Sequence, residues 1–344
     1  MIGRYERVPV PAAGLRLHLN ENTAGCSPAV REALQAVTRQ QAACYPDYDA
    51  AQRACAARFG VPPECLQLTN GLDEGILAVS VAAFRGGGRT DGRAIIVVPA
   101  FDMYAICAGA AGGAIDEIPL GAEFNFPLEA VLRAISPDIR LIFLTNPNNP
   151  TGRPIPREAI LTVARHATGA LVFVDEAYAD FSGETLLGAP ELAALPNVVL
   201  GRTFSKAYGL AGIRVGAIVG SPDTLEPIRR VVPPYSLNVY ATVGVCAALA
   251  DLEYYEWYLD QVSASKALLY EGLDRLGVRY WRSAANFVLA DFGPEARRVI
   301  AALAARQIYV RDRRIDPACP GCVRITTGIV EHTRPLVAAL EEVL

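Results

Sequence analysis

Short apolar runs alternate with helical patterns along the first two thirds of the chain. Five of these runs are rich in Val, Ile and Leu: residues 94–98, 141–144, 171–174, 198–200 and 215–219. Short continuous runs of this kind are typical of strands that are buried on both faces. The pattern therefore predicts an α/β fold in which a mainly parallel sheet is covered by helices.

Two helices between the predicted strands have recognisable starts. Ser27 followed by Pro28 is a typical helix cap and first position, and predicts a helix over residues 29–41. An asparagine and two acidic residues precede an apolar stripe, which predicts a second helix over residues 71–84. The glycine-rich segment 85–92 is expected to be a surface loop.

The pattern changes near residues 232–235, Val-Pro-Pro-Tyr. A helical pattern over residues 241–276 follows, and a final helix is predicted from about Thr333. Between them lie three segments that are expected to be strands: NFVLADF (286–292), IYVRDRR (308–314) and VRITTG (323–328). This order is typical of a small α+β unit. We therefore expect three parts: an N-terminal arm that joins the small domain (1–30), a large domain (31–232) and the small domain (233–344).

Composition and charge narrow the class of protein. With 344 residues, a net charge of −4 and 52% hydrophobic residues, the chain can bury a large core and is not expected to bind nucleic acid. Residues 94–115 are long enough to span a bilayer, but Pro99 and Asp102 interrupt them, so no membrane segment is expected. A cytoplasmic location is expected because the start of the chain lacks an apolar signal core.

The eight cysteines are spread through the chain and are expected to be reduced thiols. Cys319 and Cys322 form the only CxxC motif. A closed zinc site normally has four ligands, and the chain offers no second pair at a suitable spacing. No metal is therefore expected.

Candidate chemistry follows the predicted strands. The chain has no GxxxxGK[ST] motif, no GxGxxG motif after a strand and no GxSxG motif. Instead, polar segments come directly after three of the strands, at residues 146–152, 175–178 and 202–206. The carboxyl ends of parallel strands are where an open α/β sheet binds its ligand.

These residue types suit an aldehyde cofactor with a phosphate tail. Lys206 can form a Schiff base with the aldehyde, and Asp175 can keep a pyridine nitrogen protonated so that the ring accepts electrons. Arg214, Thr203 and Ser205 can hold the phosphate.

Three motifs resemble the fold-type I aminotransferases that depend on pyridoxal 5′-phosphate, most closely the histidinol-phosphate aminotransferase group: NPNNPTG (146–152), DEAYADF (175–181) and RTFSKAYGLAGIRVG (202–216). The resemblance extends from Leu19 to Gly328. It implies a large domain built on a mainly parallel seven-stranded sheet and a smaller α+β domain.

The resemblance also implies roles for single residues. Lys206 would carry the cofactor and move a proton between the substrate and the cofactor, and Asp175 would pair with the ring nitrogen. Asn149 and Tyr178 would contact the ring hydroxyl, and Phe101 would stack on the ring. Lys206, Asp175 and Tyr178 are the expected catalytic residues.

The phosphate of the cofactor would lie on backbone amides at the start of the helix predicted over residues 71–84. The expected phosphate ligands are Gly71, Leu72, Asp73, Thr203, Ser205 and Arg214. Tyr45, in CYPDYD, matches a tyrosine that the family contributes across a dimer interface, so the resemblance implies a homodimer. Cys44 stands where the family usually has arginine.

Three residues are implied to bind substrate. Arg324 resembles the arginine that holds the α-carboxylate of amino-acid substrates, and Arg311 resembles a second arginine that helps to hold the phosphate of histidinol phosphate. Asn22 belongs to the N-terminal motif of the substrate pocket. In that motif this chain has Ala24 where the family usually has an aromatic residue.

The expected reaction is L-histidinol phosphate plus 2-oxoglutarate to imidazole acetol phosphate plus L-glutamate, which is a step of histidine biosynthesis. An aromatic amino-acid aminotransferase remains an alternative, since Ala24 leaves room for another donor. A lyase similar to threonine-phosphate decarboxylase is a second alternative, since it shares NPNNPTG and the lysine. A non-catalytic protein that binds the cofactor is the least favoured alternative because the expected site residues are all present.

Overall fold

A seven-stranded sheet forms the centre of the computed structural model, which describes residues 10–85 and 92–344. The strand order is β2-β8-β7-β6-β5-β3-β4, and all neighbours are parallel except β8, which runs antiparallel to β2 and β7. The strands are β2 (Leu66–Thr69), β3 (Arg93–Val98), β4 (Ala114–Pro119), β5 (Ile139–Thr145), β6 (Leu171–Asp175), β7 (Val198–Thr203) and β8 (Gly216–Val219). The predicted mainly parallel sheet is confirmed.

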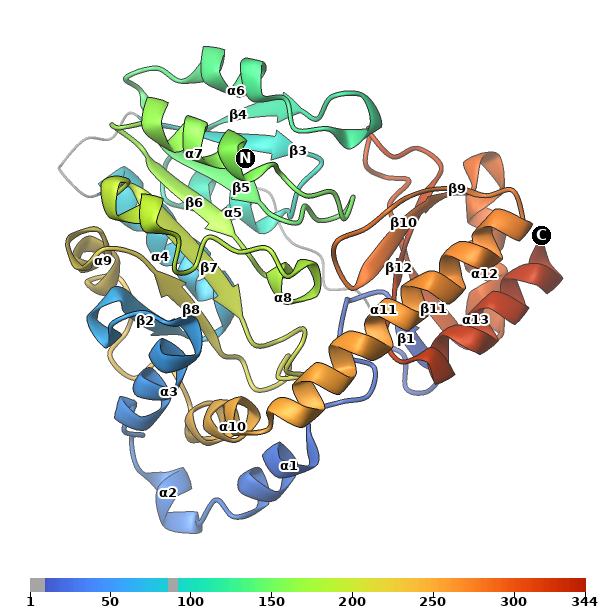
Figure 1. Ribbon diagram of the computed structural model, residues 1–344, viewed down its shortest axis with the longest axis horizontal. Helices are drawn as coiled ribbons and strands as arrows, with labels where there is room; N and C mark the ends of the chain where they lie inside the picture. The colour runs from blue at the N-terminus through green and yellow to red at the C-terminus, as the bar shows by residue number, and fades with distance from the viewer. Residues whose placement is uncertain (1–9, 86–91) are drawn as a thin grey trace.

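Both faces of this sheet are buried, as the apolar runs indicate. Along β5, Leu141 and Phe143 belong to one apolar cluster, and Ile142 and Leu144 belong to another. In Figure 1, α7 lies in front of the sheet and α4 behind it. The helices of this region are α1 (Pro28–Gln35), α2 (Arg39–Ala43), α3 (Asp49–Phe59), α4 (Gly71–Arg85), α5 (Met103–Ala110), α6 (Leu128–Ala134), α7 (Arg157–His166), α8 (Ala179–Ser182), α9 (Pro222–Arg229) and α10 (Val239–Ala250).

A second, five-stranded sheet has the order β1-β11-β12-β10-β9. Its first strand comes from the N-terminal part of the chain and pairs in parallel with β11, and Figure 1 shows this blue strand among orange and red ones. The strands are β1 (Leu15–Leu17), β9 (Arg279–Trp281), β10 (Phe287–Asp291), β11 (Ile308–Asp312) and β12 (Cys322–Thr326), and the helices are α11 (Leu252–Arg275), α12 (Ala296–Ala305) and α13 (Val330–Val343). The three strands that the sequence predicts here are confirmed.

Two helices that the sequence predicts as continuous are each interrupted, so both predictions are wrong in this respect. The helix expected over residues 29–41 ends at Gln35, and α2 starts after Thr38, whose side chain forms a capping box with Gln41. The helix expected over residues 241–276 breaks at Asp251, whose carboxylate accepts a hydrogen bond from the Tyr254 amide and so starts α11. In both places a polar side chain offers the backbone an alternative partner.

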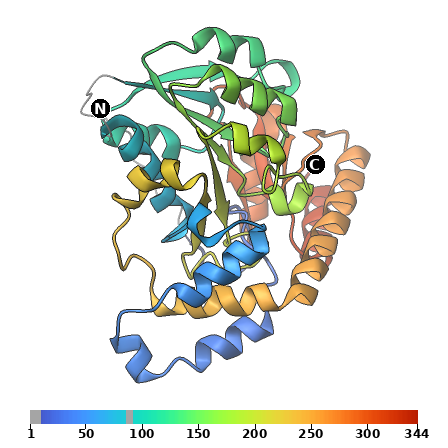
Figure 2. The same ribbon diagram turned by 60° about the vertical axis from the view of Figure 1, so that its left-hand side comes forward.

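The final helix starts at Val330, about one turn earlier than expected. Helix α10 packs against α1 and α3 and shares an apolar cluster with the large sheet. Figure 2 shows α10 lying above α1. The division of the chain into three parts stays a prediction. Most of the loop expected over residues 85–92 lies outside the described residues.

Short 3₁₀ helices connect some of these elements: η1 (Pro63–Cys65), η2 (Ala122–Phe124), η3 (Pro190–Ala194) and η4 (Gly293–Glu295). In the described ranges, none of the helices has both the length and the apolar content that are needed to cross a membrane. All eight cysteines are free. Within residues 10–85 and 92–344, no group of three or more His, Cys, Asp and Glu side chains is placed to hold a metal ion.

Candidate active site

A single cavity gathers most of the residues that the sequence predicts as functional. It lies where β5, β6 and β7 end side by side, and residues of the small sheet line it as well. Twelve of the fifteen predicted site residues line this cavity: Leu72, Asp73, Phe101, Asn149, Asp175, Tyr178, Thr203, Ser205, Lys206, Arg214, Arg311 and Arg324. Their proximity agrees with the strand-end argument, and their roles stay predictions.

The other three predicted residues lie elsewhere. Gly71 is the first residue of α4, next to the cavity residue Leu72. Asn22 lines a neighbouring cavity instead. Its Nδ2 donates a hydrogen bond to the carbonyl of Ala207, and its Oδ1 accepts one from the Ala24 amide, so it fixes the N-terminal segment. Tyr45 is 77% exposed and does not line the cavity of its own chain.

Lys206 follows β7 by three residues and lines the cavity. Its Nζ donates a hydrogen bond to the backbone carbonyl of Leu19, 3.1 Å away. Burial lowers the pKa of Lys206 to about 8, and the nearby positive charge of Arg324 lowers this pKa as well. A lysine in this setting has a substantial neutral fraction near physiological pH, which a nucleophilic or proton-accepting amine needs.

Asp175 is the last residue of β6 and is almost fully buried. The hydroxyl of Tyr104 donates to its Oδ2 over 2.7 Å, and the Ala177 amide donates to its Oδ1 over 2.9 Å. Thr145 in turn donates to the Tyr104 oxygen. Burial raises the pKa of Asp175 to about 6, although both hydrogen bonds lower it. Such a carboxyl favours a positively charged partner in the cavity.

The start of α4 forms a cradle with Arg214. Gly71 has φ +71°, and a side chain there would collide with the Arg214 guanidinium. Arg214 itself has φ +64°, a strained conformation for a residue other than glycine, and its Nη2 donates to Asp73 over 2.9 Å. The first amides of a helix have no partner within the helix, so this cradle suits a phosphate.

Two further predicted residues are fixed by buried partners. The Tyr178 hydroxyl accepts a hydrogen bond from Asn20 Nδ2 over 3.0 Å, and burial raises the pKa of Tyr178. Asn149 Oδ1 accepts a hydrogen bond from an Nη atom of Arg324. The Tyr178 hydroxyl and the Asn149 side chain are therefore held in place before any ligand binds, which reduces the cost of binding.

Arg311 and Arg324 are direct partners across the β11–β12 pair. The second Nη of Arg324 donates to the carbonyl of His18 over 2.9 Å. Among the described residues, the Arg311 side chain has no hydrogen-bond or ion-pair partner. Two guanidinium groups on one face of a sheet, facing one cavity, suit an anionic substrate group.

Sequence reasoning missed Tyr104 and Asn20. Tyr104 lies on α5, one helical turn after Phe101, and its hydroxyl reaches Asp175 only through the packing of α5 on the sheet. Asn20 has φ +56°, which asparagine tolerates better than most residues. Its position within the Asn-Glu-Asn segment next to Asn22 is the signal that could have pointed to it.

The family model described as aminotransferase class I and II matches residues 13–340. The chain belongs to this family. Because the match extends from before β1 into α13, it includes all the residues of the cavity.

Curated and solved relatives of this aminotransferase cover most of its length. It is 34% identical over 338 residues to histidinol-phosphate aminotransferase 2 of Ralstonia nicotianae, which is 96% of this chain and 88% of that protein. It is 35% identical over 334 residues to histidinol-phosphate aminotransferase of Symbiobacterium thermophilum, which is 96% of this chain and 90% of that protein. A solved structure of histidinol-phosphate aminotransferase from Sinorhizobium meliloti, in complex with pyridoxal 5′-phosphate, matches with a TM-score of 0.84 and 26% identity, over 96% of this chain and 90% of that one.

The aminotransferase has only two lysines, Lys206 and Lys266. Lys266 lies on α11, and its Nζ donates to the carbonyl of Ser283 over 3.1 Å. It does not line the cavity, whereas Lys206 does. Lys206 is therefore the one lysine amine available to the chemistry of this cavity.

Proposed function

We propose that this aminotransferase transfers the amino group of L-histidinol phosphate to 2-oxoglutarate with the help of pyridoxal 5′-phosphate, and so acts in histidine biosynthesis. The observation that carries the proposal is the Arg311–Arg324 pair, which faces the same cavity as the buried Lys206. The names of the relatives support the same substrate.

The residues of the cavity fit the cofactor. Lys206 supplies an amine, Asp175 supplies a buried carboxyl for the ring nitrogen, and the start of α4 with Arg214 supplies a phosphate cradle. Tyr178 and Asn149 would contact the ring hydroxyl. When bound, pyridoxal 5′-phosphate supplies an aldehyde that bonds to an amine and a ring that withdraws electrons.

Lys206 would perform the proton transfer at the donor. Burial favours its neutral form, so its Nζ can accept the proton of the donor α-carbon and then return it at a neighbouring position. Arg324 lowers the pKa of Lys206 and at the same time faces the anionic group of the donor. The same side chain thus favours the reactive form of the amine and orients the substrate.

L-Histidinol phosphate carries a phosphate ester where an amino acid carries its α-carboxylate. Arg324 would hold either group, and Arg311 would add contacts to the phosphate, which has more oxygens and more charge. One pocket can then accept both the phosphorylated donor and L-glutamate. This two-arginine arrangement favours the phosphorylated donor over a purely aromatic one.

A screen of amino donors with the protein loaded with cofactor tests the proposal. With 2-oxoglutarate as acceptor, L-histidinol phosphate should give kcat/KM at least 10-fold above phenylalanine and tyrosine, because one added hydrogen bond to a charged group is worth about that factor. Formation of L-glutamate and the change in cofactor absorbance are the measurements. A preference for phenylalanine or tyrosine, or release of carbon dioxide from threonine phosphate, would select one of the alternative enzymes. No spectral response to any donor would leave a non-catalytic protein.

A homodimer belongs to this proposal, with Tyr45 reaching the cavity of the partner subunit. Its support is that Tyr45 is exposed and stacks on the exposed Tyr235, with ring centroids 4.3 Å apart. Sedimentation should give a mass of about twice 36.8 kDa. Tyr45→Ala should weaken cofactor binding about 10-fold, the value of one hydrogen bond to a charged group. A monomer with full activity would contradict this part of the proposal.

A cytoplasmic location also belongs to the proposal. Its support is the free state of all eight cysteines. Cys319 and Cys322 are in one turn and are still unpaired, as is typical of a reducing compartment.

A further inference from the structure

A third arginine, Arg313, lines the cavity together with Arg311 and Arg324. It stands two residues after Arg311 and one residue beyond the end of β11. Its amide still donates to the carbonyl of Cys322, at the start of β12, so the pairing of the two strands continues to this position. Side chains two positions apart along a strand point to the same face. Arg311 and Arg313 therefore present their guanidinium groups on one side of the sheet.

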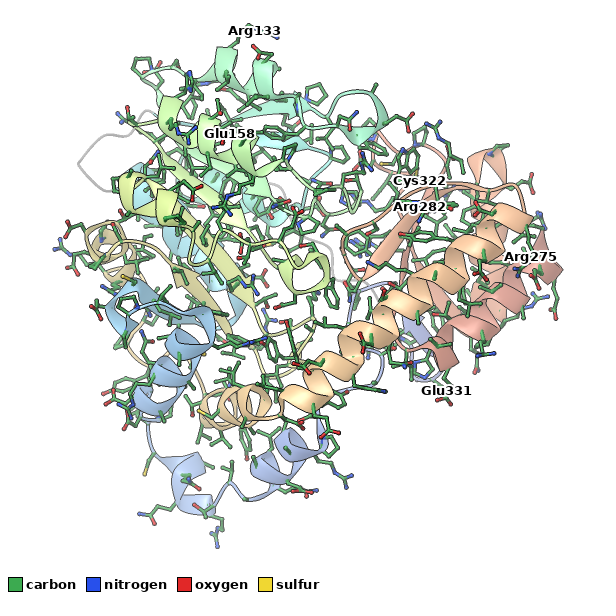
Figure 3. The ribbon with its side chains drawn as sticks, in the orientation of Figure 1. Arg133, Glu158, Arg275, Arg282, Cys322 and Glu331 are labelled. Atoms are coloured by element: carbon green, nitrogen blue, oxygen red, sulfur yellow. The ribbon has the colours of Figure 1, made fainter. Side chains whose placement is uncertain are left out.

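Arg313 is held rigidly where it lies. Only 8% of the residue is exposed, and its Nη2 donates to Asp316 over 2.8 Å. Its carbonyl accepts a hydrogen bond from the Asp316 amide, which closes the turn after β11. Figure 3 labels Cys322, which marks where the turn returns to the sheet. A side chain fixed in this way loses little conformational freedom when it binds a ligand.

The hydrogen-bonding capacity of Arg313 is only partly used. The Nε atom is buried and donates to no described acceptor, and Nη1 likewise has no acceptor among the described residues. An arginine offers five N–H donors, and buried donors without acceptors are costly. The turn thus holds the Arg313 guanidinium group at the wall of the cavity, where its Nε and Nη1 N–H groups have no acceptor among the described residues.

The charges around the cavity point to the kind of anion. Asp316 balances Arg313, whereas Arg311 has no carboxylate partner within the described ranges. Arg324 donates to the side-chain oxygen of Asn149 and to the backbone carbonyl of His18. A phosphate monoester carries nearly two negative charges and more acceptor oxygens than a carboxylate, so it can accept hydrogen bonds from Arg311 and Arg313 together.

We propose that Arg313 is a specificity-determining residue, which binds the phosphate of the donor together with Arg311 and so favours a phosphate monoester over a carboxylate. This inference rests on the proposed function, because the phosphate in question is that of the donor. It adds a third guanidinium group to the two that the family resemblance implies.

The test compares two neighbouring arginines in the cofactor-loaded enzyme. Arg313→Gln should lower kcat/KM for L-histidinol phosphate about 10- to 100-fold, mainly through KM, the range for one hydrogen bond to a charged group. The half-reaction with L-glutamate should change less than about threefold. Arg314→Gln is the matched control, because Arg314 pairs with Asp312 and does not line the cavity. It should leave both reactions unchanged.

A binding measurement separates this inference from the proposed function. Calorimetry of the loaded enzyme with inorganic phosphate should show about 10-fold weaker binding in Arg313→Gln, with binding partly restored in Arg313→Lys. Equal losses for L-histidinol phosphate and L-glutamate, or unchanged phosphate binding, would overturn the inference. If the unmodified enzyme does not use L-histidinol phosphate but Arg313→Gln still weakens phosphate binding, the proposed function fails and the phosphate site stands.

Discussion

Lys206→Ala is expected to reduce amino transfer by about 10⁴-fold or more. The substitution removes both the amine that would bond to the cofactor and the base that would take the proton of the donor, and each role alone contributes orders of magnitude. No other lysine can replace it, because Lys266 is the only other lysine and lies outside the cavity. The measurement is the rate of L-glutamate formation from L-histidinol phosphate and 2-oxoglutarate.

Lys266→Ala is the matched control for this experiment. Lys266 is half-buried, and burial lowers its pKa as well, but among the described residues the hydrogen-bond acceptor of its Nζ is the carbonyl of Ser283, away from the cavity. Its replacement should leave the rate within a few-fold of the unmodified enzyme. After borohydride treatment, mass spectrometry should find the cofactor on the peptide that contains Lys206 in both the unmodified enzyme and Lys266→Ala. An adduct on Lys266, or comparable activity of Lys206→Ala, would remove Lys206 from the mechanism.

The same lysine gives the reaction a defined pH dependence. A pKa of about 8 lies below the ordinary value for lysine, so the amine of the cofactor-free protein becomes neutral as the pH rises through about 8. Only the neutral amine attacks an aldehyde. The rate at which cofactor-free protein combines with added pyridoxal 5′-phosphate should therefore rise with pH up to about 8 and then level off. A rate that continues to rise towards pH 10 would indicate an ordinary exposed lysine.

The sequence predicts much of the site because many of its residues lie at or just after the ends of predicted strands. Thr145, Asp175 and Thr203 are the last residues of three neighbouring strands, so the apolar runs alone indicate that the polar residues at and after the strand ends lie at one edge of the sheet. The motif with Lys206 follows one of these strands directly. The residues of the motifs therefore lie at the strand ends that line the cavity, and for this reason the resemblance and the structure point to the same residues.

Other parts of the site depend on contacts that no local pattern contains. Tyr104 reaches Asp175 from α5, and Asn20 reaches Tyr178 from a segment 158 residues away in the chain. In the sequence, Arg313 is one of four consecutive charged residues, and nothing distinguishes it from its neighbours. In the structure, its ion pair with Asp316 holds it at the cavity. In each case the position of the side chain is set by tertiary packing rather than by its neighbours in sequence.

Parts of the fold also could not be predicted from the local sequence pattern. Strands β2 and β4 are absent from the five predicted runs, since β2 is short and β4 includes two acidic residues. The break between α10 and α11 depends on the side chain of Asp251, which competes for the backbone within an otherwise helical pattern. Apolar periodicity predicts the type of an element better than it predicts where that element ends.

Asp175→Asn is the second substitution with a large expected effect. The amide has almost the same shape as the carboxyl but carries no negative charge, so it cannot stabilise a protonated ring nitrogen. We expect kcat/KM for L-histidinol phosphate to fall about 10³-fold, the upper range for the loss of one fixed electrostatic partner in an active site. Stopped-flow absorbance of the half-reaction with L-glutamate measures the same loss without the acceptor.

Tyr104→Phe is the control that separates charge from hydrogen bonding at Asp175. It removes the hydroxyl that donates to Oδ2 over 2.7 Å but keeps the carboxylate. Because that hydrogen bond lowers the pKa of Asp175, its loss should raise this pKa further and reduce the rate by a few-fold, most strongly at low pH, where more of the carboxyl is protonated. Equal losses in Asp175→Asn and Tyr104→Phe would mean that the position of the side chain matters and its charge does not. A much larger loss in Asp175→Asn, at every pH tested, would show that the negative charge under the ring nitrogen is what the buried end of β6 provides.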